Sequence, residues 1–436
     1  MTGAPRIALL YAVMAGLILS VGAFQSWTLA LAILNLQIIS AIMALGVNMQ
    51  WGYAGLFNVG IMGFAALGGV AAVLTSMPPT PGAIAAGGWN LGLVALSIVG
   101  TLGAALFLRD RLAPGVRGPA SLIVVLIGYA IMRVFLEPAS LAIEAIDPSA
   151  AGYLGGLGLP VLISWAVGGL FAAGAAYLVG KIALGLRSDY LAIATLGISE
   201  IILAAIKNEN WLTRGVKNVT GIPRPVPTER ELQAAPWVAD LARRLDADLT
   251  TTAAVLVRLA YACLFTVVLV AIFWLCQRAL ASPWGRMMRA IRDNRDAAEA
   301  MGKDVTARHL QVFVLGSAVV GVAGAMLVTL DGQFTPGSYT PLRYTFIIWV
   351  MVIVGGSGNN WGAVLGAFLM WYVWVMAEPA GAALMARLTE GLAADSVLRA
   401  RLLGGAPFLR LLLMGVILLL ALRFAPRGLI PEARGR

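Results

Sequence analysis

Ionisable side chains are rare in the apolar segments of this sequence, and three of them stand out: Arg133, Glu200 and Arg258. Because a charged group within a membrane helix is costly, such residues often mark a path for ions or solutes. Arg133 and Arg258 lie within about two turns of the predicted ends of their segments, where a long side chain can reach water. Glu200 lies in the middle of LAIATLGISEII. It is therefore either a packing partner for a cation or helix dipole, or a residue of a pathway.

The sequence contains none of the common motifs for chemistry of its own. It has no GxxxxGK[ST] phosphate-binding loop, no HExxH and no GxSxG, and the single histidine, His309, has no second imidazole to work with. Cys263 and Cys276 lie in one apolar run and form neither a disulfide framework nor a metal site. We therefore predict that the chain binds no metal or cofactor. Any ATP that drives its activity would be bound by another chain.

The composition is that of an integral membrane protein. Of 436 residues, 60% are hydrophobic and 12% are charged, about half the charged share of a soluble domain. Strand-like alternation is absent, so the spans should be helices of roughly 20 residues. The 50 glycines agree with this, because small residues let membrane helices approach closely. A net charge of +10 is more typical of cytoplasmic loops here than of nucleic-acid binding.

Apolar runs predict an all-α polytopic protein with about 10–12 transmembrane helices. It divides into N-terminal helices (1–206), an extracytoplasmic loop (207–253) and C-terminal helices (254–436). The two runs at 343–355 and 362–377 are short and could be half-helices or a re-entrant pair. The predicted spans are 7–23, 28–47, 54–75, 91–108, 119–136, 160–180, 188–206, 254–277, 309–330, 343–355, 362–377 and 409–424.

The charged stretch after residue 281 predicts an amphipathic helix at 283–303, with Gly302 as its stop. Three interpretations are open: a basic helix on the lipid surface, a connector packed against its own domain, and a docking element for a soluble partner. Its apolar side chains are Met287, Ala290, Ile291, Ala297, Ala298 and Met301.

Basic residues predict the orientation. The loops 76–90 and 137–158 contain no Lys or Arg. The opposite side carries the amphipathic helix and several basic residues, which the positive-inside rule places in the cytoplasm together with both termini. These residues are Arg109, Arg111, Arg117, Lys181, Arg187, Arg423, Arg427, Arg434 and Arg436.

Two segments, 48–69 and 353–368, are rich in glycine with interspersed polar side chains. The glycines either allow close helix packing or mark broken helices whose exposed backbone lines a polar path. The predicted pathway residues are Asn48, Gly52, Gly55, Asn58, Gly60 and Glu200.

Five segments, in order, resemble one family: the permease subunits of branched-chain amino acid type ABC importers, the LivM-like group, which also includes urea and amide permeases. The resemblance covers most of the chain from about residue 40 to about residue 430. In the third segment, AAEAMG stands for the EAA signature that touches the ATPase. The segments are ALGVNMQWGYAGLFNVGIMGF, LRSDYLAIATLGISEII, SPWGRMMRAIRDNRDAAEAMGKDV, IVGGSGNNWGAVLGAF and RFAPRGLI.

Two stretches depart from the family's pattern. Where the family commonly reads SLGH, this chain has Asn58 and Ile61. Where it often reads LTGGTNGLTGIP, this chain reads LTRGVKNVTGIP, and a longer outer loop follows. These departures affect the predicted substrate more than the predicted machinery.

The resemblance implies a permease subunit that is not itself an enzyme, in a bacterial cytoplasmic (inner) membrane. Its implied partners are two ATP-binding subunits that hold ATP and Mg, a second homologous permease and an extracytoplasmic solute-binding protein. The solute would be a branched-chain amino acid or a related urea or amide. The residues implied to couple to the ATPase are Arg295, Ala297, Ala298, Glu299, Met301 and Gly302.

Two other classes of protein are compatible with parts of the pattern. A channel or secondary carrier would use the amphipathic helix only as a membrane-surface element, although a proton-coupled carrier usually has more buried carboxylates or histidines. A membrane-embedded enzyme lacks support, because the sequence has no histidine pair, metal spacing or nucleophile motif.

Overall fold

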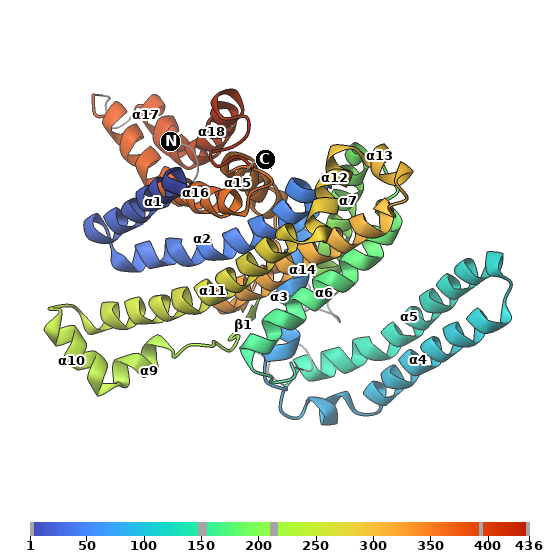
Figure 1. The fold of residues 1–436 in the computed structure, drawn as a ribbon. Helices are drawn as coiled ribbons and strands as arrows, with labels where there is room; N and C mark the ends of the chain where they lie inside the picture. Colours follow the sequence, from blue (N-terminus) through green and yellow to red (C-terminus); the bar gives the residue numbers. More distant parts are fainter. Residues whose placement is uncertain (1–3, 147–154, 210–216, 392–395, 433–436) are drawn as a thin grey trace.

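The computed structural model describes residues 4–146, 155–209, 217–391 and 396–432 as a bundle of long helices (Figure 1). Two short strands, β1 (Val219–Thr220) and β2 (Gln333–Phe334), pair in antiparallel register. The α-helices are α1 (Ala4–Phe24), α2 (Trp27–Asn48), α3 (Ile61–Ser76), α4 (Ala83–Arg111), α5 (Pro114–Glu144), α6 (Val161–Ala183), α7 (Ser188–Asn208), α9 (Glu229–Ala234), α10 (Pro236–Arg244), α11 (Leu249–Ala281), α12 (Pro283–Asp293), α13 (Arg295–Ala300), α14 (Val305–Asp331), α15 (Ile347–Gly355), α16 (Asn360–Leu388), α17 (Val397–Gly405) and α18 (Leu409–Phe424).

Four shorter helical turns complete the chain. Two are π-helical: η1 (Met49–Tyr53) continues α2, and η3 (Leu342–Phe346) precedes α15. The other two are 3-10 turns, η2 (Pro336–Ser338) and η4 (Ala406–Phe408). π-helical turns are rare overall but frequent at functional sites. The residues around η1 and η3 are therefore candidates for the functional site.

Ten helical segments in the described part of the chain are long and apolar enough to cross a membrane. Two shorter apolar helices, Ile61–Ser76 and Arg343–Gly355, add to them. The prediction of an all-α polytopic membrane protein is therefore confirmed.

The structure corrects two of the predicted spans in particular. The span predicted at 54–75 starts later, because residues 55–60 are not helical and α3 begins at Ile61. The segment 362–377, considered as a half-helix, is part of the 29-residue helix α16. Glu378 and Pro379 end the apolar run in the sequence, but the helix continues past both residues.

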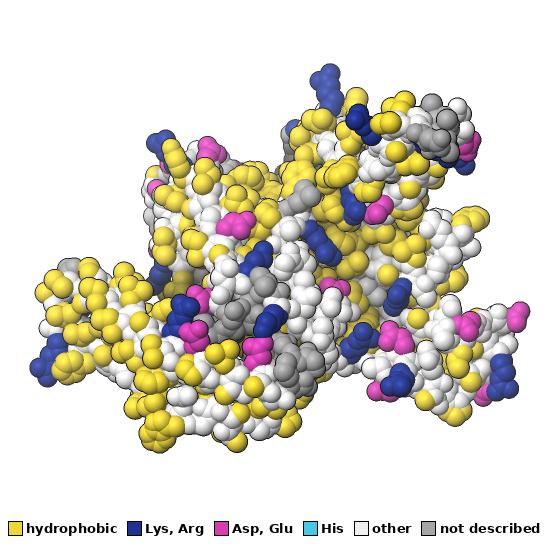
Figure 2. Space-filling view, turned by 180° about the vertical axis from the view of Figure 1, so that it is seen from behind, with side chains coloured by type: hydrophobic (Ala, Val, Ile, Leu, Met, Phe, Trp, Pro, Cys, Tyr) yellow, Lys and Arg dark blue, Asp and Glu magenta, His cyan; other side chains and the backbone are white. Residues whose placement is uncertain are grey.

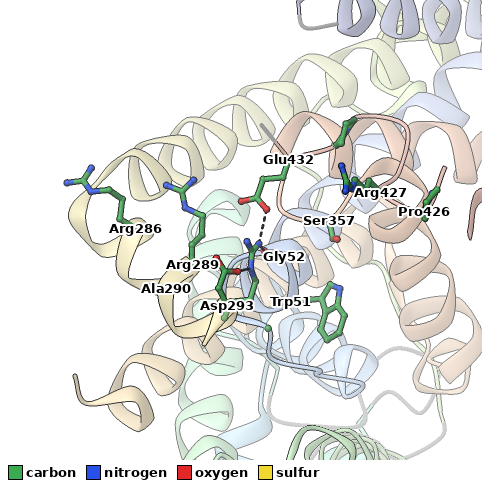
Figure 3. A pocket seen from close by; sticks show the side chains of 13 residues that line it. Trp51, Gly52, Arg286, Arg289, Ala290, Asp293, Ser357, Pro426, Arg427 and Glu432 are labelled. Atoms are coloured by element: carbon green, nitrogen blue, oxygen red, sulfur yellow. Dashed lines mark hydrogen bonds and ion pairs between the residues drawn. The ribbon is translucent and has the colours of Figure 1, made fainter. Parts of the chain in front are cut away.

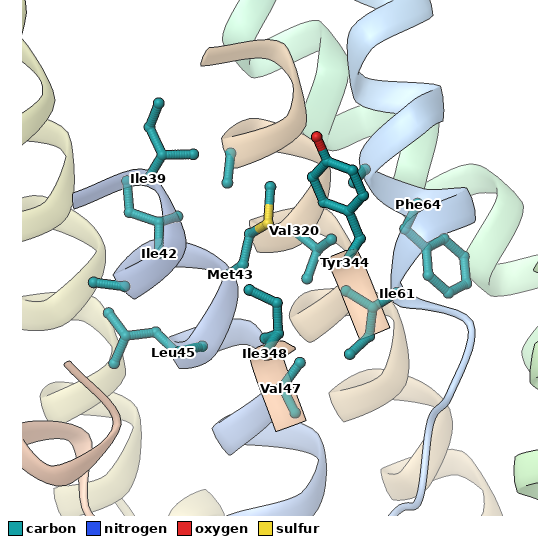
Figure 4. Packing of buried hydrophobic residues seen from close by; sticks show 14 of the residues in the cluster. Ile39, Ile42, Met43, Leu45, Val47, Ile61, Phe64, Val320, Tyr344 and Ile348 are labelled. Carbon is teal, nitrogen blue, oxygen red and sulfur yellow. The ribbon is translucent and has the colours of Figure 1, made fainter. Parts of the chain in front are cut away.

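The core is built around α2 and α14. Helix α14 packs against α2, α3 and α6, while α2 also packs against α11, α15 and α16. Both are among the most buried helices, which explains why their sequences are apolar on all sides. Figure 4 shows this packing through the labelled side chains Ile39, Ile42, Met43, Leu45, Val47, Ile61, Phe64, Val320, Tyr344 and Ile348.

Glycines let α3, α6 and α14 pack backbone against backbone. A Cβ on Gly324 of α14 would overlap the carbonyl oxygen of Ala65 in α3. A Cβ on Gly321 would crowd Ala172 and the carbonyl oxygen of Gly168 in α6. At these positions the close-packing interpretation of the glycines is correct.

Helices α4 and α5 form a hairpin beside the bundle (Figure 1). They pack closely against each other and at most sparsely against other described helices, and only 6% of the residues in each apolar window are buried. Figure 2 shows the hairpin surface as mostly hydrophobic, whereas the surface of α9 and α10 carries charges of both signs. The hairpin surface therefore suits lipid, and the α9–α10 surface suits water.

Helix α11 separates the α9–α10 region from α12 and α13 (Figure 1). Its 33 residues correspond to about 50 Å, longer than a hydrocarbon core of about 30 Å. The Asp248 side chain caps its first turn, and Ser282 begins the next helix. The outer loop and the amphipathic segment of the sequence prediction thus lie at opposite ends of one helix.

The packing at Gly324 is testable by one added methyl group. We expect Gly324→Ala to lower the free energy of unfolding by about 1–3 kcal/mol, because the new Cβ overlaps a backbone oxygen that has little room to move. The measurement is the thermal midpoint of the detergent-purified protein. Gly174→Ala in α6, where a Cβ meets nothing within 4 Å, is the control and should be neutral or stabilising. Equal losses in both variants would contradict this packing.

Candidate translocation and coupling site

The first interruption of a membrane helix lies between α2 and α3. The π-helical turn η1 ends at Tyr53, and residues 55–60 are not helical before α3 begins. Gly55 has φ +69°, a conformation that favours glycine. We call residues 49–60 the first break.

The second interruption lies between α15 and α16. Gly356 and Gly358 have φ values of +122° and +80°, so the chain can reverse direction there, and the Asn359 side chain caps α16. We call residues 356–359 the second break. The two breaks touch: a Cβ on Gly52 would overlap the backbone nitrogen of Gly358.

Buried amides join the two breaks. The Asn48 side chain accepts a hydrogen bond from the Gly358 N–H (2.8 Å) and donates to Asn360 Oδ1 (3.1 Å). The Tyr53 hydroxyl donates to the same Asn360 oxygen (2.6 Å). Asn48 is fully buried and Asn360 is 1% exposed. Hydrogen bonds that satisfy buried groups in this way fix the geometry, because breaking one leaves a polar group without a partner.

A second buried group holds the far end of the first break. Asn58 Nδ2 donates to Gln50 Oε1 (2.9 Å), and Gln50 donates in turn to the Phe313 carbonyl oxygen of α14 (2.9 Å). The Asn58 side-chain oxygen accepts from the Gly60 N–H (2.9 Å), and its backbone oxygen accepts from Trp349 Nε1 (3.0 Å). The first break is thus a rigid, hydrogen-bonded structure.

Five of the six predicted pathway residues lie in the first break or at its edge. They are Asn48, Gly52, Gly55, Asn58 and Gly60. Glu200 is not among them: it lies on the exposed side of α7, whose opposite side contacts the break through Thr195 and Ser199. Sequence reasoning missed Gln50, Tyr53 and Asn360, although all three stand inside the two segments flagged as rich in glycine and polar residues.

The amphipathic segment is two helices, which corrects the prediction of one helix at 283–303. Asn294 leaves the helical conformation (φ −155°, ψ 99°) and its side chain caps α13 by accepting from the Ala297 N–H (3.0 Å). Asparagine is a strong N-cap, and this preference outweighs continuous amphipathic periodicity. Gly302, with φ +74°, ends α13 as predicted.

The predicted coupling residues present an open surface. Ala297, Glu299 and Met301 are exposed, with Met301 at 79%, while Ala298 is buried against the chain. Arg295 forms an exposed ion pair with Glu299 (3.0 Å). An exposed methionine and alanine on a short helix form the kind of surface that a partner covers.

Arg292 connects α12 directly to both breaks. Its Nη1 donates to the Gly52 carbonyl oxygen and to Glu432 Oε2 (3.0 Å). A Cβ on Gly55 would lie 3.2 Å from the Arg292 side chain, and one on Gly358 would lie 3.3 Å from its Nη1. Burial lowers the pKa of Arg292, but its hydrogen bond to Glu432 and the charges of Glu432 and Asp293 raise the pKa above its ordinary value. The guanidinium therefore stays charged.

A cleft of about 1350 Å³ opens between α12, the first break and the C-terminal tail. Figure 3 shows Arg286 and Arg289 extending from α12, with Glu432 and Arg427 on the opposite side. Trp51 and Ser357 belong to the two breaks and line the cleft between these sides. The arrangement positions the breaks beside a polar, water-accessible space.

A sequence model of a known family matches residues 83–422, and its description is "Branched-chain amino acid transport system / permease component". This chain belongs to that family. The match covers more than three-quarters of the sequence and includes the second break, α12 and α13.

Three relatives of this permease are named as branched-chain amino acid transport permeases. The probable LivM protein of Methanocaldococcus jannaschii is 26% identical over 399 residues, 90% of each chain. The LivM protein of Salmonella typhimurium is 30% identical over 206 residues, 46% of this chain and 47% of its own. That of Escherichia coli is 29% identical over 208 residues, 47% and 48% of the two chains. No solved structure matches the permease.

The link through Arg292 is testable in the purified permease. We expect Arg292→Met to lower the free energy of unfolding by about 1–3 kcal/mol, because it leaves the buried Gly52 carbonyl and Glu432 without their donor. The measurement is the thermal midpoint in detergent. Arg289→Met, one turn earlier in the same cleft, is the control: Arg289 has no hydrogen bond or ion pair with another described residue, so about 0.5 kcal/mol or less should be lost. Similar shifts in the two variants would count against the link.

Proposed function

We propose that this permease component couples ATP hydrolysis in partner chains to solute passage through the movement of α12 and α13. The observation that carries the proposal is Arg292, which joins α12 to Gly52 in the first break and lies against Gly358 in the second. A displacement of α12 is therefore passed to both breaks through one charged side chain. Switching of this kind is a rigid-body motion of a packed element against its neighbours.

The partners are two ATP-binding subunits, which hold ATP and Mg, a second homologous permease and an extracytoplasmic solute-binding protein. The exposed surface of Ala297, Glu299 and Met301 on α13 supports contact with an ATPase, because it is small, partly apolar and free of other described elements. Arg295, Ala298 and Gly302 support that surface by an ion pair, by packing and by ending the helix.

The two breaks line the path on the α12 side of the membrane. Asn48, Gly52, Gly55, Asn58 and Gly60 hold the first break closed in this conformation, and the cleft beside it gives access to water. Polar backbone at membrane depth is tolerated where it lines such a space.

Glu200 faces the second permease in this proposal. It lies on the exposed side of α7, in a segment long and apolar enough to cross the membrane, where a carboxylate is costly against lipid. A water-filled contact between two permeases removes that cost.

The proposed orientation places both termini, α12 and α13 in the cytoplasm, within a bacterial cytoplasmic membrane. The basic residues of the α12–α13 end support this through the positive-inside rule. The three proposed regions are the helices of 1–206, the outer loop 207–253, and the helices of 254–436 with the coupling segment 283–303. Charges of both signs on α9 and α10 suit an outer loop in water.

The proposed solutes are branched-chain amino acids, which the names of the matched relatives support. A related small polar solute, such as urea or an amide, is the second choice. Shorter matches to fructose and xylose permeases cover a quarter of the chain or less.

The coupling surface is tested by purifying the tagged chain from its native membrane in mild detergent. We expect wild type to recover ATPases, a second permease and ATPase activity, and Glu299→Arg and Gly302→Trp to lose the ATPases while remaining folded. The exposed Arg295–Glu299 pair contributes only about 0.3–0.5 kcal/mol, so its reversal should not unfold the chain. The readouts are the co-purifying chains and solute uptake.

Asp240→Arg on α10 is the matched control, because it breaks another exposed local ion pair, Asp240–Arg243, at the opposite end of α11. It should keep both the ATPases and uptake. Retained uptake in Glu299→Arg and Gly302→Trp would overturn the coupling role of α13. A wild-type chain recovered alone would favour a channel or secondary carrier.

A further inference from the structure

Arg343, in the π-helical turn η3, is held in place by two aromatic rings. Its guanidinium carbon lies 5.3 Å from the ring centre of Tyr344 and 5.7 Å from that of Trp371 in α16. Tyr344 is stacked in turn on Tyr339, with ring centres 5.1 Å apart. Such contacts orient a guanidinium while leaving its N–H groups available for hydrogen bonds.

The donors at this position lack acceptors. Arg343 forms no ion pair with a described carboxylate, and its buried Nε has no hydrogen-bond partner among the described residues. The same holds for Nε1 of Trp371, a residue only 6% exposed. Both side chains line one cavity of about 10 Å³, room for a single water molecule. Asp331 interacts electrostatically with Arg343, but the two side chains form no ion pair within 4.0 Å.

A second arginine, Arg410 of α18, also packs on a tryptophan of α16 and has the acceptor that Arg343 lacks. Arg410 lies over the ring of Trp374, with 4.9 Å between its guanidinium carbon and the ring centre. Its Nη2 donates to Glu378 Oε2 at 2.6 Å. The two sites share an arginine on a tryptophan of α16, but only Arg410 forms an ion pair with a described carboxylate.

The cavity is connected to the first break through α2 and η3. It is lined by Ser40 and Met43 of α2, and α2 runs from there to Asn48 and the first break. Within η3, Thr345 Oγ1 donates to the Val59 carbonyl oxygen (3.2 Å), so η3 is also bonded directly to the first break. A ligand that moves η3 would therefore act on the same structure as Arg292.

We propose that Arg343 and Trp371 bind the carboxylate of the transported solute. This inference rests on the proposed function, because it takes the solute to be an amino acid. A guanidinium binds a carboxylate through paired hydrogen bonds, and the indole N–H adds a third donor. A carboxylate needs more room than this cavity offers, so η3 shifts on binding. A π-helical turn has room to tighten, since each of its hydrogen bonds spans one residue more than in an α-helix.

The test measures ligand-induced thermal stabilisation of the purified assembly, without the binding protein. The probes are leucine, isocaproate, which lacks the ammonium group, and leucinamide, which lacks the carboxylate. Leucine and isocaproate should raise the thermal midpoint of wild type, because a ligand bound to the native state stabilises it, and leucinamide should not. Arg343→Gln should abolish the shift, and Arg343→Lys should keep part of it. In uptake assays Arg343→Gln should raise the KM for leucine about 10- to 100-fold.

Arg410→Gln is the matched control and should keep both stabilising ligands, because Arg410 already has Glu378. Should Arg343→Gln fold poorly, Trp371→Phe removes the donor and keeps a ring, so it should weaken the shift while Trp374→Phe leaves it unchanged. The site is overturned if leucinamide stabilises as well as isocaproate, if Arg343→Gln keeps the shift, or if neither carboxylate stabilises wild type. Loss of the co-purifying ATPases from wild type would instead overturn the proposed function.

Discussion

The contact between Gly52 and Gly358 is the constraint on which the rest of the site depends. Neither break has room for a side chain there, so the two backbones meet directly and Asn48 can reach the Gly358 N–H. The Tyr53–Asn360 bond and the bond from Arg292 to the Gly52 carbonyl lie beside this contact. A side chain at Gly52 would overlap both the Asn48 side chain and the Gly358 nitrogen, and would therefore disturb these bonds together.

Rigidity is unevenly distributed around this contact. The breaks, α2 and α14 are mostly buried, whereas α13 and the α4–α5 hairpin are exposed over most of their surface. Arg292 connects the buried and the exposed regions. The aliphatic part of its side chain lies against the first break at Gly55, and its helix, α12, leads to the exposed helix α13. Close-packed interiors transmit displacement with little loss, so a motion that begins at α13 has a short and stiff route to the backbone of the first break.

The sequence predicted the helical class, the family and most of the first break, because composition, apolar run length and the order of motifs do not depend on tertiary contacts. It could not predict that α13 is a separate helix, since the cap at Asn294 competes with a periodicity that continues through it. It did not single out Arg343 as an intramembrane charge, because the residue is the first of the predicted span 343–355. Asn360 and Phe313, which bond to Asn48 and Gln50, lie more than 250 residues away from them, and no local pattern indicates such pairs.

The hydrogen bond between Asn48 and Asn360 joins residues separated by 312 positions. During synthesis the N-terminal helices enter the bilayer long before α16 is made. Asn48 and Tyr53 are therefore in the membrane before their shared partner, Asn360, has been synthesised. Contacts so distant in sequence form late and are slow to find. The nascent chain is therefore most vulnerable to misassembly and proteolysis just before its last helices are inserted, and the same polar groups that later hold the breaks together would mark an unfinished molecule for quality control.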